Sequence, residues 1–197
     1  MKINGVTVED TFAEVFSIYI GSVLITAATR RWALESALEA KGLGRSATIP
    51  PSEAWIQRDV SGIETPDKRP GYIFLVGDRK RKALDYWLVV RIRKGVLPIP
   101  TTAAFDALPK EMRGAEGYVE IQNTPVQMFG DGYEEIVDLF DRRMYKIPRM
   151  DGFFYVEEKF SVAKGFAGAT SSSWLTLNNL LCSQRKPQST PSGRFRT

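Results

Sequence analysis

Apolar residues in the first half of the chain form runs that predict two buried strands separated by a helix. Residues 18–28 (IYIGSVLITAA) and 72–76 (YIFLV) are apolar and rich in β-branched or aromatic side chains, as is typical of buried strands. Thr29 is placed to cap a helix over residues 30–42. Residues 50–70 contain four prolines and are expected to form a long loop.

A second amphipathic helix is predicted after residue 76, with Asp78 as its cap and Gly95 at its end. Residues 96–100 (VLPIP) are then expected to be extended, because each proline disfavours helix in the residue before it. The apolar positions recur at three- and four-residue steps and are Ala83, Leu84, Trp87, Leu88 and Ile92.

The order strand, helix, loop, strand, helix favours the α/β class, with helices on one face of a mixed sheet. Residues 117–160 differ, because extended segments alternate there with Gly-Asp and Asp-Gly turns. They are interpreted as a β-rich insertion or as the start of a second lobe. No internal sequence repeat is evident.

The composition excludes several kinds of chemistry. The chain has no histidine and one cysteine, Cys182. A Ser-His-Asp triad, a histidine-ligated metal, a multi-cysteine metal site and an internal disulfide are therefore impossible within this sequence. We expect no metal.

The net charge of +4 is confined to the end of the sequence. Four of the 27 basic residues and no acidic residue lie in 169–197, so the first 168 residues hold 23 basic and 23 acidic side chains. We therefore expect no nucleic-acid partner. No apolar run is long enough for a membrane span and nothing at the start resembles a signal peptide, so a cytoplasmic location and no membrane partner are expected.

The segment 100–106 (PTTAAFD) is the best candidate for small-molecule binding. Thr101 and Thr102 offer hydroxyls and amides at the end of an extended segment, and Asp106 is placed either to cap or to bind. The alternative is a strand-to-helix junction with threonine as the N-cap, which needs no ligand.

Two further candidates lie in predicted turns and loops. Phe129, Gly130 and Asp131 belong to a Gly-Asp-Gly turn that either covers a ring of the substrate or is a plain hairpin turn. Glu53, in the proline-flanked loop, is either a proton carrier or a solvated surface glutamate.

Seven segments together resemble the formylmethanofuran–tetrahydromethanopterin formyltransferase family, in order and spacing, from residue 1 to residue 168. The segments are 3–14 (INGVTVEDTFAE), 23–33 (VLITAATRRWA), 64–72 (ETPDKRPGY), 100–109 (PTTAAFDALP), 129–135 (FGDGYEE), 142–154 (RRMYKIPRMDGFF) and 165–168 (GFAG).

The resemblance implies an enzyme that moves a formyl group from the amine of methanofuran to a nitrogen of tetrahydromethanopterin. It implies an α+β sandwich of two similar ferredoxin-like lobes, a homo-oligomer, no metal and no tightly bound cofactor, with both coenzymes acting as substrates. Residues 1–145 would be the N-terminal lobe and residues 146–168 the start of a truncated C-terminal lobe. Cysteines that the family usually carries near 48–53 and before the PTT segment are absent here.

Residues 169–197 have no clear period and a Ser/Pro/Gly-rich end, and we expect an unrelated, disordered tail there. A single-base frameshift after Gly168 would explain it. Read one base earlier, a TCN serine codon becomes a codon for Phe, Leu, Ile or Val. The whole stretch then permits a buried strand, an alanine-rich helix and a Gly-Pro stop.

Three hypotheses for function follow. The chain is a formyltransferase-family protein, expected to be a truncated and inactive copy. Alternatively it is a non-catalytic, single-lobe interaction subunit that pairs with a full-length homologue. The third hypothesis, an unrelated small α/β binding domain, is disfavoured by the seven segments.

Overall fold

The computed structural model describes residues 2–3, 6–7, 15–42, 52–121, 133–150 and 152–168. Residues 17–165 form one compact unit, and residues 1–16 and 166–197 group separately. The helical elements are α1 (Arg30–Gly42), α2 (Arg81–Arg91), the π-helical turn η1 (Ile92–Val96) and the 3-10 turn η2 (Lys110–Met112). The strands are β1 (Lys2–Ile3), β2 (Val6–Thr7), β3 (Val15–Thr26), β4 (Glu53–Val60), β5 (Gly71–Asp78), β6 (Ala103–Asp106), β7 (Tyr118–Glu120), β8 (Glu135–Leu139), β9 (Arg142–Arg149), β10 (Gly152–Glu157) and β11 (Lys159–Gly168).

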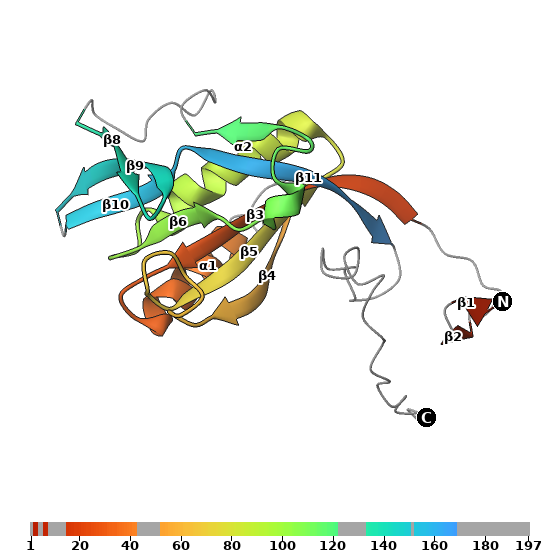
Figure 1. Ribbon diagram of the computed structural model, residues 1–197, viewed down its shortest axis with the longest axis horizontal. Helices are drawn as coiled ribbons and strands as arrows, with labels where there is room; N and C mark the ends of the chain where they lie inside the picture. Colours follow the sequence, from red (N-terminus) through yellow and green to blue (C-terminus); the bar gives the residue numbers. More distant parts are fainter. Residues whose placement is uncertain are drawn as a thin grey trace. The chain divides into compact units, whose positions relative to one another are not determined.

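Nine of the described strands form one mixed sheet, with the long strand β3 near its middle (Figure 1). The order is β4-β5-β3-β6-β10-β9-β8, and β11 pairs with both β3 and β7. Strand β3 is antiparallel to β5 and to β6, whereas β6 and β10 are parallel. Strands β1 and β2 form a separate two-stranded antiparallel ladder.

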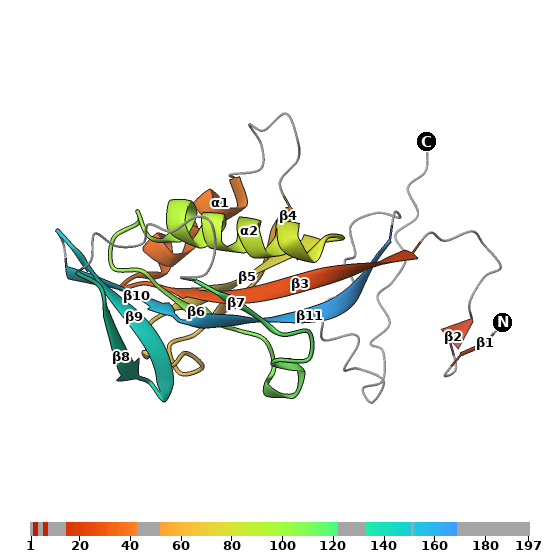
Figure 2. The same ribbon diagram turned by 90° about the horizontal axis from the view of Figure 1, so that it is seen from above.

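Helices α1 and α2 lie on the same face of this sheet (Figure 2). Alternate residues of the central strands, such as Val23 and Ile25 of β3, point to that face and are fully buried. Helix α1 contributes small residues to the interface and α2 contributes leucines, so the two helices pack closely on the strands. The buried helix residues in this core are Ala33, Ala37, Ala40, Leu84, Leu88 and Val89. The predicted mixed sheet with helices on one face is confirmed.

The opposite face of the sheet carries a smaller apolar cluster. It contains the intervening residues of the same strands, and its buried members are Leu24, Val60, Ala103, Phe105 and Met144. Strand β3 therefore contributes to both clusters, which explains why residues 18–28 are almost continuously apolar in sequence.

Helix α1 has the predicted bounds, and both of its ends are tied down. The backbone N–H of Trp32 donates to Oγ1 of Thr29 at 3.2 Å, which confirms the predicted cap. At the other end the buried Arg91 donates to the carbonyls of Ala40, Lys41 and Ser52. Because carbonyls in the last turn of a helix lack intrahelical partners, this guanidinium stabilises the end of α1 and joins it to the start of β4. Burial lowers the pKa of Arg91 to about 10.

The expectation of a continuous loop over 50–70 is wrong, because residues 53–60 form β4. The prolines lie on either side of this strand and not within it. Strand β4 is at the sheet edge and is largely half-buried or exposed, and its register against β5 shifts between Ile56 and Arg58. A bulge of this kind breaks the two-residue alternation by which an edge strand is recognised in sequence.

Residues 96–100 are also not extended as predicted. The backbone N–H of Leu97 donates to the carbonyl of Ile92 at 3.0 Å, which continues the helix as a π-helical turn. Three backbone carbonyls of this segment are bound by side chains. Thr102 Oγ1 donates to Val96 and Ile99, and Arg149 donates to Leu97 and Ile99. These side-chain bonds, of which those from Arg149 are long-range, offset the local preference against helix before proline.

The start of α2 differs from the prediction by two residues. Lys80, not Asp78, is the N-cap, and its side chain makes no capping bond. Asp78 ends β5, accepting from the N–H of Lys80 at 2.7 Å and from Oγ of Ser52 at 2.6 Å. The carboxylate therefore organises the turn before the helix without being its cap.

The β-rich character predicted for residues 117–160 is confirmed by strands β7 to β11. Strand β9 crosses the predicted boundary at residue 145, and β10 pairs with β6 of the central sheet. Residues up to 165 belong to the same compact unit as residues 17–145. The division into lobes remains a prediction, and the predicted tail, 169–197, lies outside the described residues.

No helix in the described part of the chain is long and apolar enough to cross a membrane. Within the same residues, no group of three or more Cys, Asp or Glu side chains is placed to hold a metal ion.

Candidate functional site

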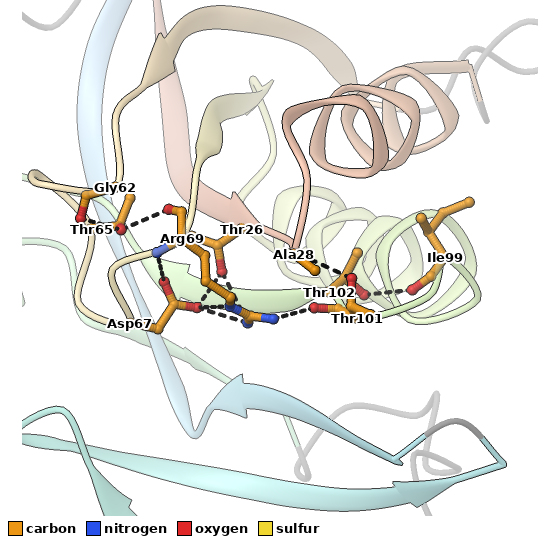
Figure 3. A network of polar contacts seen from close by, with 9 residues as sticks. All are labelled: Thr26, Ala28, Gly62, Thr65, Asp67, Arg69, Ile99, Thr101 and Thr102. Carbon is orange, nitrogen blue, oxygen red and sulfur yellow. Dashed lines mark hydrogen bonds and ion pairs between the residues drawn. The ribbon is translucent and has the colours of Figure 1, made fainter.

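Three of the seven family-like segments meet at one end of the central sheet. The register of β3 pairs Thr26 with Gly71 at the start of β5 and with Ala103 at the start of β6. The segments 23–33, 64–72 and 100–109 are therefore neighbours in space. Figure 3 shows the polar side chains that join them, which we call the Thr101 network: Thr26, Thr65, Asp67, Arg69, Thr101 and Thr102.

Asp67 and Arg69 form the centre of the Thr101 network. Oδ2 of Asp67 accepts from Oγ1 of Thr26 at 2.6 Å and from Nε of Arg69 at 2.8 Å. The Arg69 guanidinium also donates to the backbone carbonyl of Thr101 and, at 3.3 Å, to Oγ1 of Thr26. The Asp67 side chain is 4% exposed and that of Arg69 is 30% exposed, so this is a largely desolvated, charge-assisted pair.

The loop that carries Asp67 and Arg69 is fixed by its own sequence. Oγ1 of Thr65 donates to the carbonyls of Gly62 and Arg69 at 3.1 and 2.7 Å. A Cβ on Gly62 would lie 2.4 Å from the carbonyl oxygen of Lys68, so only glycine permits this close approach. Lys68 has a positive φ of 61°, which turns the chain between Asp67 and Arg69.

Thr101 has an unusual backbone conformation and a hydroxyl with spare capacity. Its φ is +62°, in the left-handed region, which costs an L-residue roughly 1–2 kcal/mol and is rarer still for a β-branched one. Oγ1 of Thr101 accepts from the N–H of Ala28 at 3.0 Å. Within the described residues its hydroxyl hydrogen has no recorded acceptor. Thr101 is only half-buried, so this hydrogen is available to a ligand.

Thr102 is placed differently from Thr101 although it is the next residue. It is fully buried, and its hydroxyl donates to the carbonyls of Val96 and Ile99 at 2.8 and 2.9 Å. The Thr102 hydroxyl therefore stabilises the backbone of residues 96–99, and any ligand contact by this side chain remains a prediction. Neither threonine is a helix N-cap, because the segment leads into β6. The strand-to-helix alternative is therefore wrong.

Asp106 lies at the other end of β6, in a second polar group that we call the Asp106 cluster: Asp106, Arg113, Arg142, Glu157 and Ser161. The carboxylate is 3% exposed and accepts from Oγ of Ser161 at 2.5 Å, from the N–H of Ser161 at 3.2 Å and from the N–H of Leu108 at 3.0 Å. Arg113 lies 3.7 Å from Oδ2 of Asp106. Four groups thus surround the two carboxylate oxygens.

Glu157 is the second carboxylate of the Asp106 cluster, and its side chain is largely buried. It accepts from the backbone N–H of Asp106 at 2.8 Å and pairs with Arg142 at 2.5 Å. Burial raises the pKa of Glu157 above its ordinary value, and the attraction of Arg142 counters this only in part.

The structure separates the predicted site residues. Strand β6 begins at Ala103, two residues after Thr101, and ends at Asp106, so the two residues lie at opposite ends of the segment and at most roughly 17 Å apart, at about 3.3 Å per residue. Glu53 is exposed and pairs in register with Gly77, whereas the Thr101 network adjoins Gly71 at the other end of β5. Phe129, Gly130 and Asp131 lie outside the described residues. Their binding roles all remain predictions.

The surface beside the Thr101 network carries basic side chains that are paired with acidic ones. Arg30, in the first turn of α1, donates to the hydroxyl of Tyr72 at 3.1 Å and pairs with Asp59 at 2.5 Å. The hydrogen bond that Arg30 donates to Tyr72 is the main reason that the pKa of Arg30 is raised. Arg69, in the neighbouring loop, is paired in the same way with Asp67, so the charges of these two arginines are largely balanced.

Sequence reasoning missed Asp67 and Arg69, although both lie within one of the family-like segments. Their spacing of two residues across a Pro-flanked turn was a usable signal, because an Asp side chain often binds the backbone two residues on. Here Oδ1 of Asp67 accepts from the N–H of Arg69 at 3.2 Å. Arg81, in the first turn of α2, was also missed. It pairs with Asp85 at 2.6 Å and donates to the carbonyls of Glu116 and Tyr118, which anchors β7.

Comparison with known proteins agrees with the segments that meet here. The family model for formylmethanofuran-tetrahydromethanopterin formyltransferase matches residues 1–149. The chain belongs to this family. It is 45% identical over 168 residues to the formylmethanofuran–tetrahydromethanopterin formyltransferase of Methanocaldococcus jannaschii, covering 85% of this chain and 54% of the relative. The enzyme of the same name from Methanothermobacter thermautotrophicus is 44% identical over 169 residues, covering 85% and 55%.

Two solved formyltransferase-family structures share the fold. That of the Methanosarcina barkeri formyltransferase matches with a TM-score of 0.71 and 45% identity, covering 85% of this chain and 55% of that one. A chain of the formyltransferase/hydrolase complex of Methylorubrum extorquens, solved with methylofuran, matches with a TM-score of 0.67 and 30% identity, covering 84% and 53%. The chain spans about half the length of the curated relatives it matches.

Proposed function

We propose that this chain supplies one part of a formyltransferase that moves a formyl group from formylmethanofuran to tetrahydromethanopterin. The observation that carries the proposal is 45% identity over 168 residues to an enzyme of that name, with three family-like segments meeting around Thr101. The reaction would take place in the cytoplasm, in a homo-oligomer of the complete protein.

The proposed reaction is a transfer between two nitrogens without oxidation or reduction. The bond between the formyl carbon and the methanofuran nitrogen breaks, and a bond forms between that carbon and a nitrogen of tetrahydromethanopterin. One proton moves from the pterin nitrogen to the methanofuran nitrogen. Such chemistry requires a polarised carbonyl and a carboxyl or hydroxyl group to move the proton, so we expect no metal and no tightly bound cofactor.

Within the described residues, the Thr101 network is the proposed contact region for a coenzyme. Thr101 offers a free hydroxyl hydrogen on a half-buried residue, beside the cationic side chains of Arg69 and Lys68. Glu53, Phe129, Gly130 and Asp131 remain proposed contacts without support from described geometry. Thr102 and Asp106 are proposed to act through the positions of their neighbours, because both are almost completely buried.

The 197-residue polypeptide tested by itself is expected to show little or no transfer. It matches about half of the length of its relatives, and orientation of two reactants contributes roughly 7–11 kcal/mol to such reactions. The test supplies both coenzymes and compares formyl transfer with that of the Methanosarcina barkeri enzyme. Turnover within tenfold of that enzyme would show that the matched part suffices.

A matched test of the site uses the Methanosarcina barkeri enzyme, changed to alanine at the positions that superimpose on Thr101, Thr102 and Asp106. We expect the Thr101 position to alter transfer most. Unchanged rates at all three positions would remove this end of the sheet from the proposed site. Transfer of some other acyl group, with no formyl transfer, would contradict the proposed reaction itself.

A second candidate function is a non-catalytic subunit that pairs with a complete homologue. The observation that favours it is the match to a chain from the formyltransferase/hydrolase complex of Methylorubrum extorquens, a multi-subunit assembly. Co-expression with a full-length relative distinguishes the two. Stable co-purification with unchanged turnover of the relative would support the subunit. Transfer that requires both chains would support a shared catalytic site.

A frameshift remains our explanation for residues 169–197. Sequencing the DNA on both sides of the Gly168 codon tests it directly. We expect one missing base, with family-like sequence continuing in another frame. DNA that encodes nothing family-like downstream would instead favour the single-lobe subunit.

A further inference from the structure

Thr101, in the proposed contact region, has a strained backbone conformation that two contacts maintain. On one side Arg69 donates to its backbone carbonyl, and on the other the N–H of Ala28 donates to its hydroxyl oxygen. A threonine does not stay in the left-handed region by its own preference, so these contacts must maintain it.

The two contacts also determine the direction of the hydroxyl. Because Oγ1 of Thr101 is occupied as an acceptor by Ala28, its remaining capacity is as a donor. Arg69 is in turn oriented by Asp67, whose Oδ2 binds Nε of Arg69 and Oγ1 of Thr26. Asp67 therefore orients Arg69, and Arg69 in turn binds the backbone of Thr101, whose hydroxyl can still donate.

We propose that Asp67 and Arg69 are positioning residues that hold Thr101 in its left-handed conformation, so that its hydroxyl donates to an oxygen atom of a bound coenzyme. This inference rests on the proposed function, because it names the group that the site presents. The acceptor is a carbonyl, carboxylate or phosphate oxygen of the coenzyme. Arg69 itself acts through Thr101 and need not contact the coenzyme.

The first experiment tests positioning without any coenzyme. The variant Arg69→Lys keeps the charge but cannot bind Asp67 and the Thr101 carbonyl at once with a planar fork. Ala28 is exposed, so protection of its amide depends on Thr101 Oγ1. We expect its hydrogen exchange in the 197-residue chain to accelerate at least tenfold in Arg69→Lys. Unchanged exchange would overturn the positioning role.

A matched control is Arg143→Lys, which weakens an exposed ion pair with Glu158 away from β3. Exchange at Ala28 should stay at the wild-type rate in that variant. Faster exchange there as well would mean that Ala28 reports general loosening, and would remove the support for a specific role of Arg69.

The second experiment tests the hydroxyl as a donor, by titrating the chain with formylmethanofuran and with tetrahydromethanopterin separately. Thr101→Val removes the hydroxyl and Thr101→Ser retains it, and Thr101→Ala serves as a second variant without the β-branch. We expect about tenfold weaker binding of one coenzyme for valine and alanine and less than threefold for serine. Wild-type affinity in both hydroxyl-free variants would overturn the donor role.

Rescue separates positioning from general structural support. Serine lacks the β-branch and adopts the left-handed region with less strain, so Arg69→Lys combined with Thr101→Ser should bind within threefold of wild type. Arg69→Lys alone should bind about tenfold more weakly, and failure of serine to restore binding contradicts the proposal. A wild-type chain that binds neither coenzyme would refute the proposed contact region and the donor role, whereas Ala28 exchange would still decide the positioning role.

Discussion

Polar residues at the two ends of the segment 101–106 have different environments, although they come from one short stretch of sequence. At its start, Thr101 is half-buried and strained and keeps an unused hydroxyl hydrogen. At its end, Asp106 is 3% exposed and its carboxylate is surrounded by Ser161, Leu108 and Arg113. Both ends are polar, but only the first has hydrogen-bonding capacity left over.

This difference shows that a buried polar group is by itself weak support for a binding site. Satisfied groups such as those around Asp106 stabilise the fold, because breaking them leaves unpaired polar atoms in a low-dielectric interior. Strain and spare donors, as at Thr101, add nothing to stability and so favour a functional explanation. The comparison can be tested one residue at a time, since the Thr101 network and the Asp106 cluster share no residue.

The largest effect is expected at the buried end of β6. Asp106→Ala leaves the hydroxyl and N–H of Ser161 without an acceptor and should lower the free energy of unfolding by about 3 kcal/mol. Urea denaturation of the 197-residue chain measures this. Asp138→Ala, an exposed position on β8, is the control and should change little. A loss below about 1 kcal/mol for Asp106→Ala would mean that the cluster is not a stabilising unit.

Thr102→Val should have an intermediate effect. It keeps the size of the side chain but removes one donor from the carbonyls of Val96 and Ile99, which keep the N–H of Ile99 and the guanidinium of Arg149 respectively. The cost by the same denaturation should be about 1 kcal/mol. Binding of either coenzyme should be affected less than by Thr101→Val. If Thr102→Val bound a coenzyme more weakly at unchanged stability, Thr102 would contact the ligand after all.

Thr101→Gly should leave the free energy of unfolding within about 0.5 kcal/mol of the wild type, because relief of strain offsets the lost hydrogen bond and the flexibility of glycine. Thr65→Gly is the matched control. Its backbone is not in the left-handed region and its hydroxyl binds two carbonyls, so about 2 kcal/mol should be lost there. Equal losses at both positions would show that Thr101 stores no strain.

The smallest expected effect is on the pH dependence of the free energy of unfolding. Its sign should differ between Glu157, in the Asp106 cluster, and Glu64, in the loop that carries Asp67. Burial raises the pKa of Glu157 above 4.5 in the folded state, so the folded protein holds a proton that the unfolded chain releases. Stability from this group is therefore lost as the pH rises from 4.5 through the folded pKa. Urea midpoints across this window should fall less steeply in Glu157→Gln than in the wild type.

Glu64, in the loop that carries Asp67, behaves in the opposite way. A hydrogen bond from Arg58 lowers the pKa of Glu64 below 4.5, so its contribution is present above pH 4.5 and is lost as the pH falls through the folded pKa. Urea midpoints below pH 4.5 should therefore decline less in Glu64→Gln than in the wild type. The same pH profile for both variants would contradict the contrast between the two ends.

Local patterns predicted much of the fold. The strands at 18–28 and 72–76, the helix at 30–42 and its Thr29 cap are all present, because each depends on neighbouring residues. The pattern failed at β4 and at residues 96–100. An edge strand with a bulge has little alternation of apolar and polar residues. The π-helical turn and the residues after it are stabilised by Thr102, which is near in sequence, and by Arg149, which is distant.

The candidate site was predicted only in part. Thr101 was identified as a candidate from its segment, but nothing local in the sequence distinguishes it from Thr102. Their opposite roles depend on contacts with Arg69 and Ala28 for one residue and with Val96 and Ile99 for the other. Asp106 was identified as part of the same segment, yet the extended backbone of β6 places it at the other end of the strand.

The sequence by itself determined the family, the main helices and strands, and the absence of histidine and disulfide chemistry, because these depend on composition and on short-range periodicity. Only the tertiary structure decided which residues meet. Thr26, Asp67, Arg69 and Thr101 are up to 75 positions apart, and they come together because β3 lies between β5 and β6 in the sheet. Strand order is set by the packing of the whole chain and not by any local pattern, so the Thr101 network could not be read from the residues that form it.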